Sequence, residues 1–133
     1  MIQEGILNPG VLELLARTRH TNKVVIADWA FPHWPEIETV DISLCREIPT
    51  INNVLKLLAP NFKVGRIFQA EEFVTTTNSQ EIIDSFDSHF AAFPDATVER
   101  PKHDDLKKLV PDCIGLIRTG DTAAYANVIL ESV

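Results

Sequence analysis

The feature that most constrains the fold is a short, continuous apolar run at residues 24–27. A run without polar alternation is typical of a strand that is buried on both faces of a sheet, and such sheets carry helices on both sides. Further strands are expected at residues 40–44, where Val40, Ile42 and Leu44 alternate with polar residues, and at 64–70 and 96–99. Two more are expected near the C-terminus, on either side of a Gly120-Asp121 turn.

Helical patterns lie between these strands. Asn8 before Pro9 has the pattern of an N-cap followed by the first helical residue, and Thr50 is a second candidate cap. Asn78 with Glu81 three residues later resembles a capping box. The expected buried stripes are Val11, Leu12, Leu15 and Ala16; Ile51, Val54, Leu55 and Leu58; and Ile82, Ile83, Phe86 and Phe90. A short helix is expected at 103–110.

Strands that alternate with helices predict an α/β fold with a largely parallel central sheet flanked by helices. The 133 residues show no repeat, linker or low-complexity segment, so residues 1–133 are expected to form a single layered domain. The last two strands are expected to form a C-terminal β-hairpin or an addition to the edge of the sheet.

Composition and charge exclude several classes of function. The net charge of −7, without basic runs, argues against nucleic acid and anionic membranes as partners. Cys45 and Cys113 lie far apart, so neither a metal site nor a redox pair is indicated, and unpaired thiols favour a cytoplasmic location. No secretory signal and no apolar run of about 20 residues is present, and no phosphate-binding glycine motif points to a nucleotide cofactor.

The C-terminal segment carries the residues that point to a ligand. Tyr125 and Asn127 are two apart, so on a strand they would face the same way. A phenol and an amide both donate and accept hydrogen bonds, which suits a neutral polyol.

Five motifs in a fixed order carry a family resemblance that covers nearly the whole chain. They are Gly5-Ile6-Leu7-Asn8, Arg19-His20-Thr21, Val25-Ile26-Ala27-Asp28, Ile117-Arg118-Thr119-Gly120 and Tyr125-Ala126-Asn127. With them the chain resembles the D-ribose pyranase / L-fucose mutarotase family. The resemblance implies an isomerase that interconverts cyclic forms of a monosaccharide, with D-ribose favoured, without a metal or other cofactor.

The resemblance also implies a ring-like homo-oligomer, commonly a decamer. The sequence agrees with an assembly, because a terminal strand with Val128, Ile129 and Leu130 would form an apolar edge that needs a cover.

Roles for six residues follow from the same resemblance. His20 is expected to be the catalytic proton donor, and Asp28, His103, Lys107, Tyr125 and Asn127 to bind the sugar. Ring opening requires an acid and a base that exchange protons near neutral pH, and imidazole suits that task. The structural alternatives are a helix C-terminal histidine for His20 and a loop cap for Asp28.

Two alternative functions stay open. The loop Trp29-Ala30-Phe31-Pro32-His33-Trp34 departs from the ribose branch and is similar to the fucose branch, which favours a mutarotase acting on L-fucose or another deoxy sugar. The aromatic rings of this loop are expected either to stack on a sugar or to pack at a subunit contact. A non-catalytic monosaccharide-binding protein is the alternative from another class.

Overall fold

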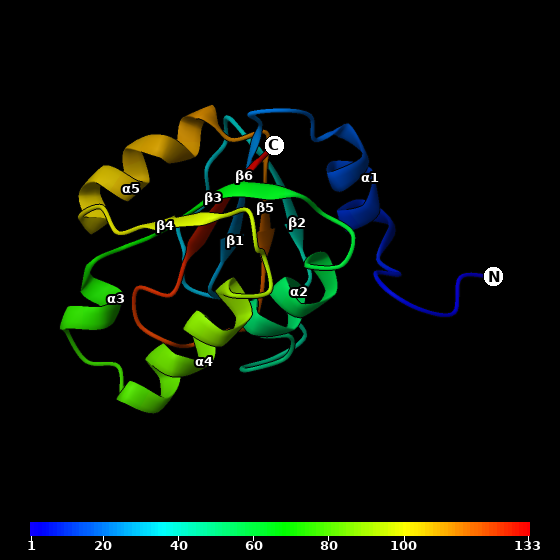
Figure 1. Cartoon of the computed structure of the whole chain (residues 1–133). Helices are drawn as coiled ribbons and strands as arrows, with labels where there is room; N and C mark the ends of the chain where they lie inside the picture. Colours follow the sequence, from blue (N-terminus) through cyan, green and yellow to red (C-terminus); the bar gives the residue numbers. More distant parts are fainter.

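The computed structural model describes residues 1–133 as one sheet with helices around it (Figure 1). The strands are β1 (Lys23–Ala27), β2 (Glu38–Asp41), β3 (Val64–Gln69), β4 (Thr97–Glu99), β5 (Gly115–Arg118) and β6 (Val128–Ser132). The helices are α1 (Pro9–Arg17), α2 (Ile51–Leu58), α3 (Glu72–Thr75), α4 (Gln80–Phe90) and α5 (His103–Leu109), with a 3-10 turn η1 (Val110–Asp112) after α5. None of the helices combines the length and the apolar character that a membrane crossing requires.

The six strands follow the order β2-β5-β1-β6-β3-β4 across the sheet. Every neighbouring pair is parallel except the two that involve β6, which runs against β1 and β3. The α/β fold with a largely parallel sheet is therefore confirmed.

The C-terminal strands differ from the expectation in one respect. The chain turns back after β5, but β1 lies between β5 and β6, so the two arms are not hydrogen-bonded to each other as a tight hairpin. The reason is that β1 is buried on both faces and takes the central place, pairing with β5 through Val25↔Leu116 and with β6 through Val25↔Ile129. The β6 strand is thus an interior strand and not an apolar edge.

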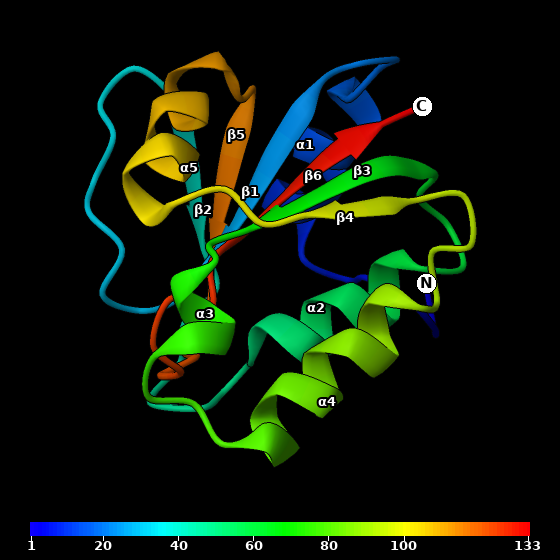
Figure 2. The ribbon, with the colours of Figure 1, turned by 60° about the vertical axis from the view of Figure 1, so that its left-hand side comes forward.

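Side chains that alternate along the strands divide the core into two layers. Val24 and Ile26 pack with α1, α2 and α4, whereas Val25 and Ala27 pack with α5 and the segment after β1. Figure 2 shows α5 on one side of the sheet and α2 and α4 on the other. The chain therefore forms three layers, helix, sheet and helix.

Local capping chemistry explains where the helices start. Asn8 accepts a hydrogen bond from Val11 N (3.0 Å), and Thr50 forms a capping box with Asn53. The helix α4 begins one residue later than expected, because Ser79 caps it and not Asn78.

Three expectations about strand and stripe positions were wrong. The strand β2 ends at Asp41, and Leu44 beyond it is 80% exposed. Leu14, absent from the expected stripe of α1, is fully buried, whereas Ala16 is exposed. Ile82 of α4 is 38% exposed.

Candidate functional site

Polar side chains gather at the edge of the sheet where the parallel strands end. Asp28 follows β1, Gln69 is the last residue of β3, and Asn127 precedes the antiparallel β6. Ligand sites of α/β sheets form at the carboxyl ends of the parallel strands, so this is the expected location for a site.

Asp28 and Asn127 hold each other by reciprocal hydrogen bonds. Asp28 N donates to Asn127 Oδ1 (2.8 Å), and Asn127 Nδ2 donates to Asp28 Oδ2 (3.1 Å). Ala30 N donates to Asp28 Oδ1 (2.9 Å). Both side chains are buried, at 9% and 4% exposure, so the pair is fixed before any ligand arrives.

Burial controls the ionisation of Asp28. Loss of solvent around the carboxyl raises its pKa, and this effect outweighs the hydrogen bonds from Ala30 and Asn127, which lower it. The nearby Asp121 carboxylate acts in the same direction as burial. Asp28 is therefore a better proton acceptor than an exposed aspartate.

His103 and Tyr125 form the second half of the cluster. Their ring centroids are 5.1 Å apart and the planes meet at 80°, edge to face. His103 begins α5, where its backbone N–H donates to Glu72 Oε2 (2.8 Å), and its buried Nδ1 has no hydrogen-bond partner. Lys107 lies one helical turn further along the same face of α5.

Tyr125 and Asn127 come together for a different reason from the one expected. Neither lies on a strand, because residues 119–127 form the connection from β5 to β6. Tyr125 has φ 57°, in the left-handed region that residues other than glycine seldom adopt. The left-handed backbone at Tyr125, and not the alternation of side chains along a strand, brings Tyr125 and Asn127 to the same site.

The cluster opens into a shallow depression of about 240 Å³. It is lined by Asp28, Ala30, Phe31, Pro32, His103, Lys107, Tyr125 and Asn127. Five of the six residues expected in the site therefore line one surface, together with an apolar wall of Phe31 and Pro32.

The two tryptophans of the aromatic loop lie outside this lining. Trp34 stacks behind Phe31 with centroids 6.4 Å apart, and Trp29 is 49% exposed beneath the Arg46 guanidinium, 5.0 Å from its ring. Of the aromatic side chains in this loop, only Phe31 lines the depression.

His20 lies at the other end of β1. It occupies an exposed turn in which Thr21 N donates to Ser132 O (3.0 Å), next to the end of β6, whereas Asn127 precedes the start of β6. The five residues of β6 that separate these ends span about 16 Å. Within one chain, His20 therefore does not reach the other five residues.

Two residues outside the six expected ones support the site: Gln69, which the sequence analysis missed, and Arg118, which it named only as part of a motif. Gln69 is fully buried and donates to Ala126 O (3.2 Å), and its position at the end of a buried strand was the available signal. Arg118 donates to the carbonyls of Phe31 and Trp29. Asp121, across the turn from Arg118, accepts instead from Ile51 N (2.9 Å) at the start of α2.

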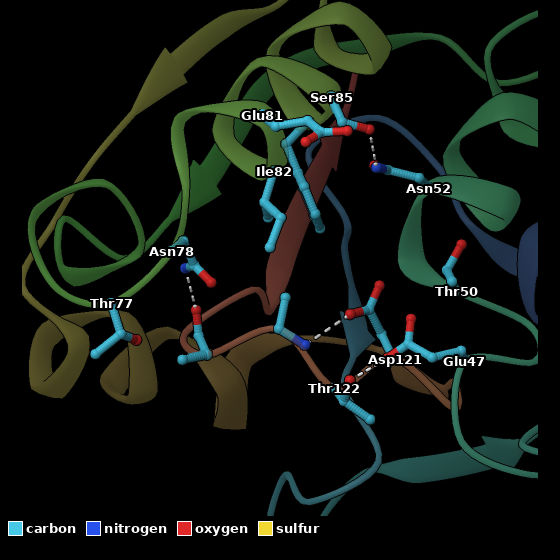
Figure 3. Close-up of a pocket in the computed structure, with 13 residues that line it drawn as sticks. Glu47, Thr50, Asn52, Thr77, Asn78, Glu81, Ile82, Ser85, Asp121 and Thr122 are labelled. Atoms are coloured by element: carbon cyan, nitrogen blue, oxygen red, sulfur yellow. Dashed lines mark hydrogen bonds between the residues drawn. The ribbon is translucent and has the colours of Figure 1, made fainter.

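A larger hollow of about 660 Å³ lies between α2, α4 and the loop at 121–124 (Figure 3). It contains none of the six expected residues. We place the candidate site at the smaller depression, because titratable groups and a buried polar pair converge there. Nowhere do three His, Cys, Asp or Glu side chains group so that they could hold a metal ion.

The model of the RbsD / FucU transport protein family matches residues 1–133. The chain belongs to this family. A D-ribose pyranase of Corynebacterium glutamicum (strain R) is 35% identical over 132 residues, covering 99% of this chain and 97% of the relative. The resemblance inferred from the five motifs is thus confirmed.

Solved structures agree with the family assignment. Bacillus subtilis RbsD complexed with D-ribose has a TM-score of 0.87 and 32% identity, covering 99% of this chain and 97% of that one. The fucose mutarotase from Streptococcus pneumoniae in complex with L-fucose has a TM-score of 0.75 at 18% identity, covering 94% and 91%, which shows a shared fold.

Proposed function

We propose that this chain interconverts the pyranose and furanose forms of D-ribose by general acid–base catalysis. The observation that carries the proposal is the buried Asp28–Asn127 pair beside His103 and Tyr125, in a chain 35% identical to a D-ribose pyranase. The site offers hydrogen bonds to a neutral polyol and groups that titrate, which is what ring opening requires.

The reaction needs two proton transfers and no redox change. A base removes the proton from the anomeric hydroxyl while an acid protonates the ring oxygen, the bond from C1 to the ring oxygen breaks, and the open-chain aldehyde forms. Another hydroxyl then attacks C1, and the protons return in the reverse sense. Holding the sugar in place turns these steps into reactions within one complex.

The residues of the depression divide these tasks. Asp28, whose pKa is raised by burial, suits proton acceptance from a sugar hydroxyl. The His103 imidazole and the Tyr125 phenol, which line the depression, supply further hydrogen-bonding groups. Lys107 at the rim adds a donor with a long reach.

His20 is the proposed proton donor, and a neighbouring subunit supplies it. Support comes from its position at the opposite end of β1, where it is exposed. A ring-like homo-oligomer, a decamer by family resemblance, would bring the exposed turn of one copy to the depression of the next.

Exposed apolar residues support such an assembly. Leu7, Leu44 and Leu57 are 59%, 80% and 42% exposed, and Leu7 and Leu57 line an apolar groove of about 330 Å³. The apolar C-terminal strand adds no support, since β6 is interior and already covered by β1 and β3. A cytoplasmic location is also proposed, supported by two cysteines without a disulfide.

A mutarotase acting on L-fucose is the second candidate. The specific observation is the Phe31–Pro32 wall, because a deoxy sugar would place its methyl group against an apolar surface. D-ribose stays first, because the C. glutamicum D-ribose pyranase and the B. subtilis structure holding D-ribose are 35% and 32% identical to this chain, against 18% for the fucose mutarotase.

The test is magnetisation exchange between sugar forms in NMR, with D-ribose and L-fucose assayed in parallel. We expect the protein to accelerate exchange between ribose pyranose and furanose signals. Exchange confined to fucose anomers would favour the second candidate. Saturation transfer to a sugar without exchange would identify a non-catalytic sugar-binding protein.

A further inference from the structure

The loop at 119–127 carries Tyr125 and Asn127, yet side chains outside the depression fix its backbone. Tyr125 has φ 57°, a conformation that a tyrosine leaves unless neighbouring contacts hold it. The contacts that hold it are therefore candidates for a role in the site.

On one side of Tyr125, the carbonyl of Ala124 is held by Asn78. Asn78 Nδ2 donates to Ala124 O (2.8 Å) and also to Phe73 O (2.9 Å). Figure 3 shows this side chain reaching across from the start of α4 to the loop. Asn78 is free for this bond because Ser79 caps α4.

On the other side, the carbonyl of Ala126 is held by Gln69. Gln69 Nε2 donates to Ala126 O (3.2 Å), and Arg100 donates to Gln69 Oε1, which fixes the orientation of the amide. Gln69 and Ala126 are both fully buried, so water does not replace this bond. Arg100 is itself held between the Phe73 and Phe90 rings, 5.7 and 5.8 Å from their centroids.

We propose that Asn78 and Gln69 are positioning residues that clamp the backbone on both sides of Tyr125. By fixing the carbonyls of Ala124 and Ala126, the two amides keep the Tyr125 ring against His103 and direct Asn127 toward Asp28. The effect of the clamp on catalysis rests on the proposed function, whereas its effect on Tyr125 does not.

Isosteric variants remove the donors without changing the shape of the side chain, and each adds one negative charge that the control variant must match. Gln69→Glu keeps an oxygen for Arg100 but loses the donor to Ala126 O, and Asn78→Asp loses both of its bonds at a half-buried position that tolerates a charge. Asn52→Asp is the matched control, because Asn52 lines the same hollow and donates to Ser85 Oγ (3.0 Å), not to the loop.

Tyr125 is the only tyrosine of the chain, so fluorotyrosine labelling gives a single ¹⁹F signal that reports on it. At pH 8 without sugar, we expect Gln69→Glu and Asn78→Asp to shift or broaden this signal and Asn52→Asp to leave it in place. With ribose, we expect each clamp variant to bind about three- to tenfold more weakly, as for one lost hydrogen bond. The double variant should fall short of the product of the single effects, because both bonds act on one loop.

An unchanged ¹⁹F signal in Asn78→Asp, together with wild-type ribose affinity, would overturn the clamp even if Gln69→Glu fails to fold. Equal effects of Asn52→Asp and Asn78→Asp would overturn it too, because the added charge alone would then explain them. If the wild-type protein neither binds nor converts ribose, the proposed function fails, whereas the ¹⁹F comparison without sugar still decides the clamp.

Discussion

At the scale of single residues, Asp28 has the clearest physical signature. Its carboxyl is buried, and burial raises its pKa above the ordinary value of 3.8. The folded state therefore holds this proton more tightly than the unfolded state. The protonated Asp28 carboxyl contributes its full stability to the folded state at pH values below 3.8, the ordinary pKa. That contribution is lost as the pH rises through the higher pKa of the folded state.

We predict that the stability of the wild type relative to Asp28→Asn decreases as pH rises from about 4 toward neutrality, because only the wild type must ionise a buried group. Thermal unfolding of both proteins across this interval measures the difference. A difference in Tm that is constant, or that grows in favour of the wild type, would show that burial does not control this carboxyl.

His20 is the opposite case, an exposed residue with a proposed chemical role. We predict that His20→Ala unfolds at the wild-type temperature but loses about 10²–10⁴-fold in ribose exchange rate, the usual contribution of a general acid. His89→Ala is the control, because His89 is a half-buried residue of α4 outside the depression, where its ring hydrogen-bonds to Ser85 O. A wild-type exchange rate in His20→Ala would contradict this role, and His103 would become the candidate general acid.

The motifs predicted which residues lie together better than they predicted the geometry that brings them together. Asp28, His103, Lys107 and Asn127 lie together as the motifs suggested. The left-handed backbone of Tyr125 was not predictable, because its cause is a pair of amides more than 40 residues away in sequence, as the separation of 46 between Asn78 and Ala124 illustrates. Local patterns carry no information about such contacts.

At the scale of elements, one glycine determines how the loop after β5 packs. Gly120 N donates to Pro49 O (2.8 Å) and its carbonyl accepts from Glu47 N (2.7 Å), so the loop lies directly on the turn before α2. A side chain at position 120 would overlap the carbonyl of Cys45 and come within 2.9 Å of that of Ile48. Both obstacles are backbone and cannot rotate away.

We predict that Gly120→Ala destabilises the protein by about 2–4 kcal/mol and reduces ribose exchange, because the displaced loop carries Tyr125 and Asn127. Gly65→Ala is the control, since the atoms nearest to its new methyl group belong to the side chain of Val133, which can move, and not to backbone. Urea denaturation of both variants gives the comparison, and equal losses of stability would contradict the packing argument.

Element boundaries followed from the sequence wherever a cap or a continuous apolar run defined them. The strand β1 and the start of α2 were placed correctly for that reason. The strand expected at 40–44 failed because the length of β2 depends on its pairing with β5, from Glu38↔Gly115 to Asp41↔Arg118. Strand pairing joins distant parts of the chain, so alternation within five residues did not define its extent.

At the scale of the whole molecule, the length of β1 separates the proposed acid from the rest of the site. Helix α1 and its following turn leave His20 at the start of β1, whereas Asp28 follows its end. No side-chain rotation bridges a strand of five residues. The proposed catalytic set is therefore incomplete within one chain, and the proposed homo-oligomer would complete it by bringing the turn of each copy to the depression of its neighbour.

The final prediction follows from this separation. Mixed oligomers of His20→Ala and Asn127→Ala, refolded together at equal concentrations, should recover activity, although each variant alone is inactive. A site is intact when its own chain has Asn127 and its neighbour has His20, which random assembly gives in about one-quarter of the sites. Ribose exchange should therefore reach about one-quarter of the wild-type rate per site. Mixing two populations of His20→Ala is the control, and it should recover nothing. Absence of recovery in mixed oligomers verified by native mass spectrometry would place the acid within the same chain, and His103 would then be the residue to test.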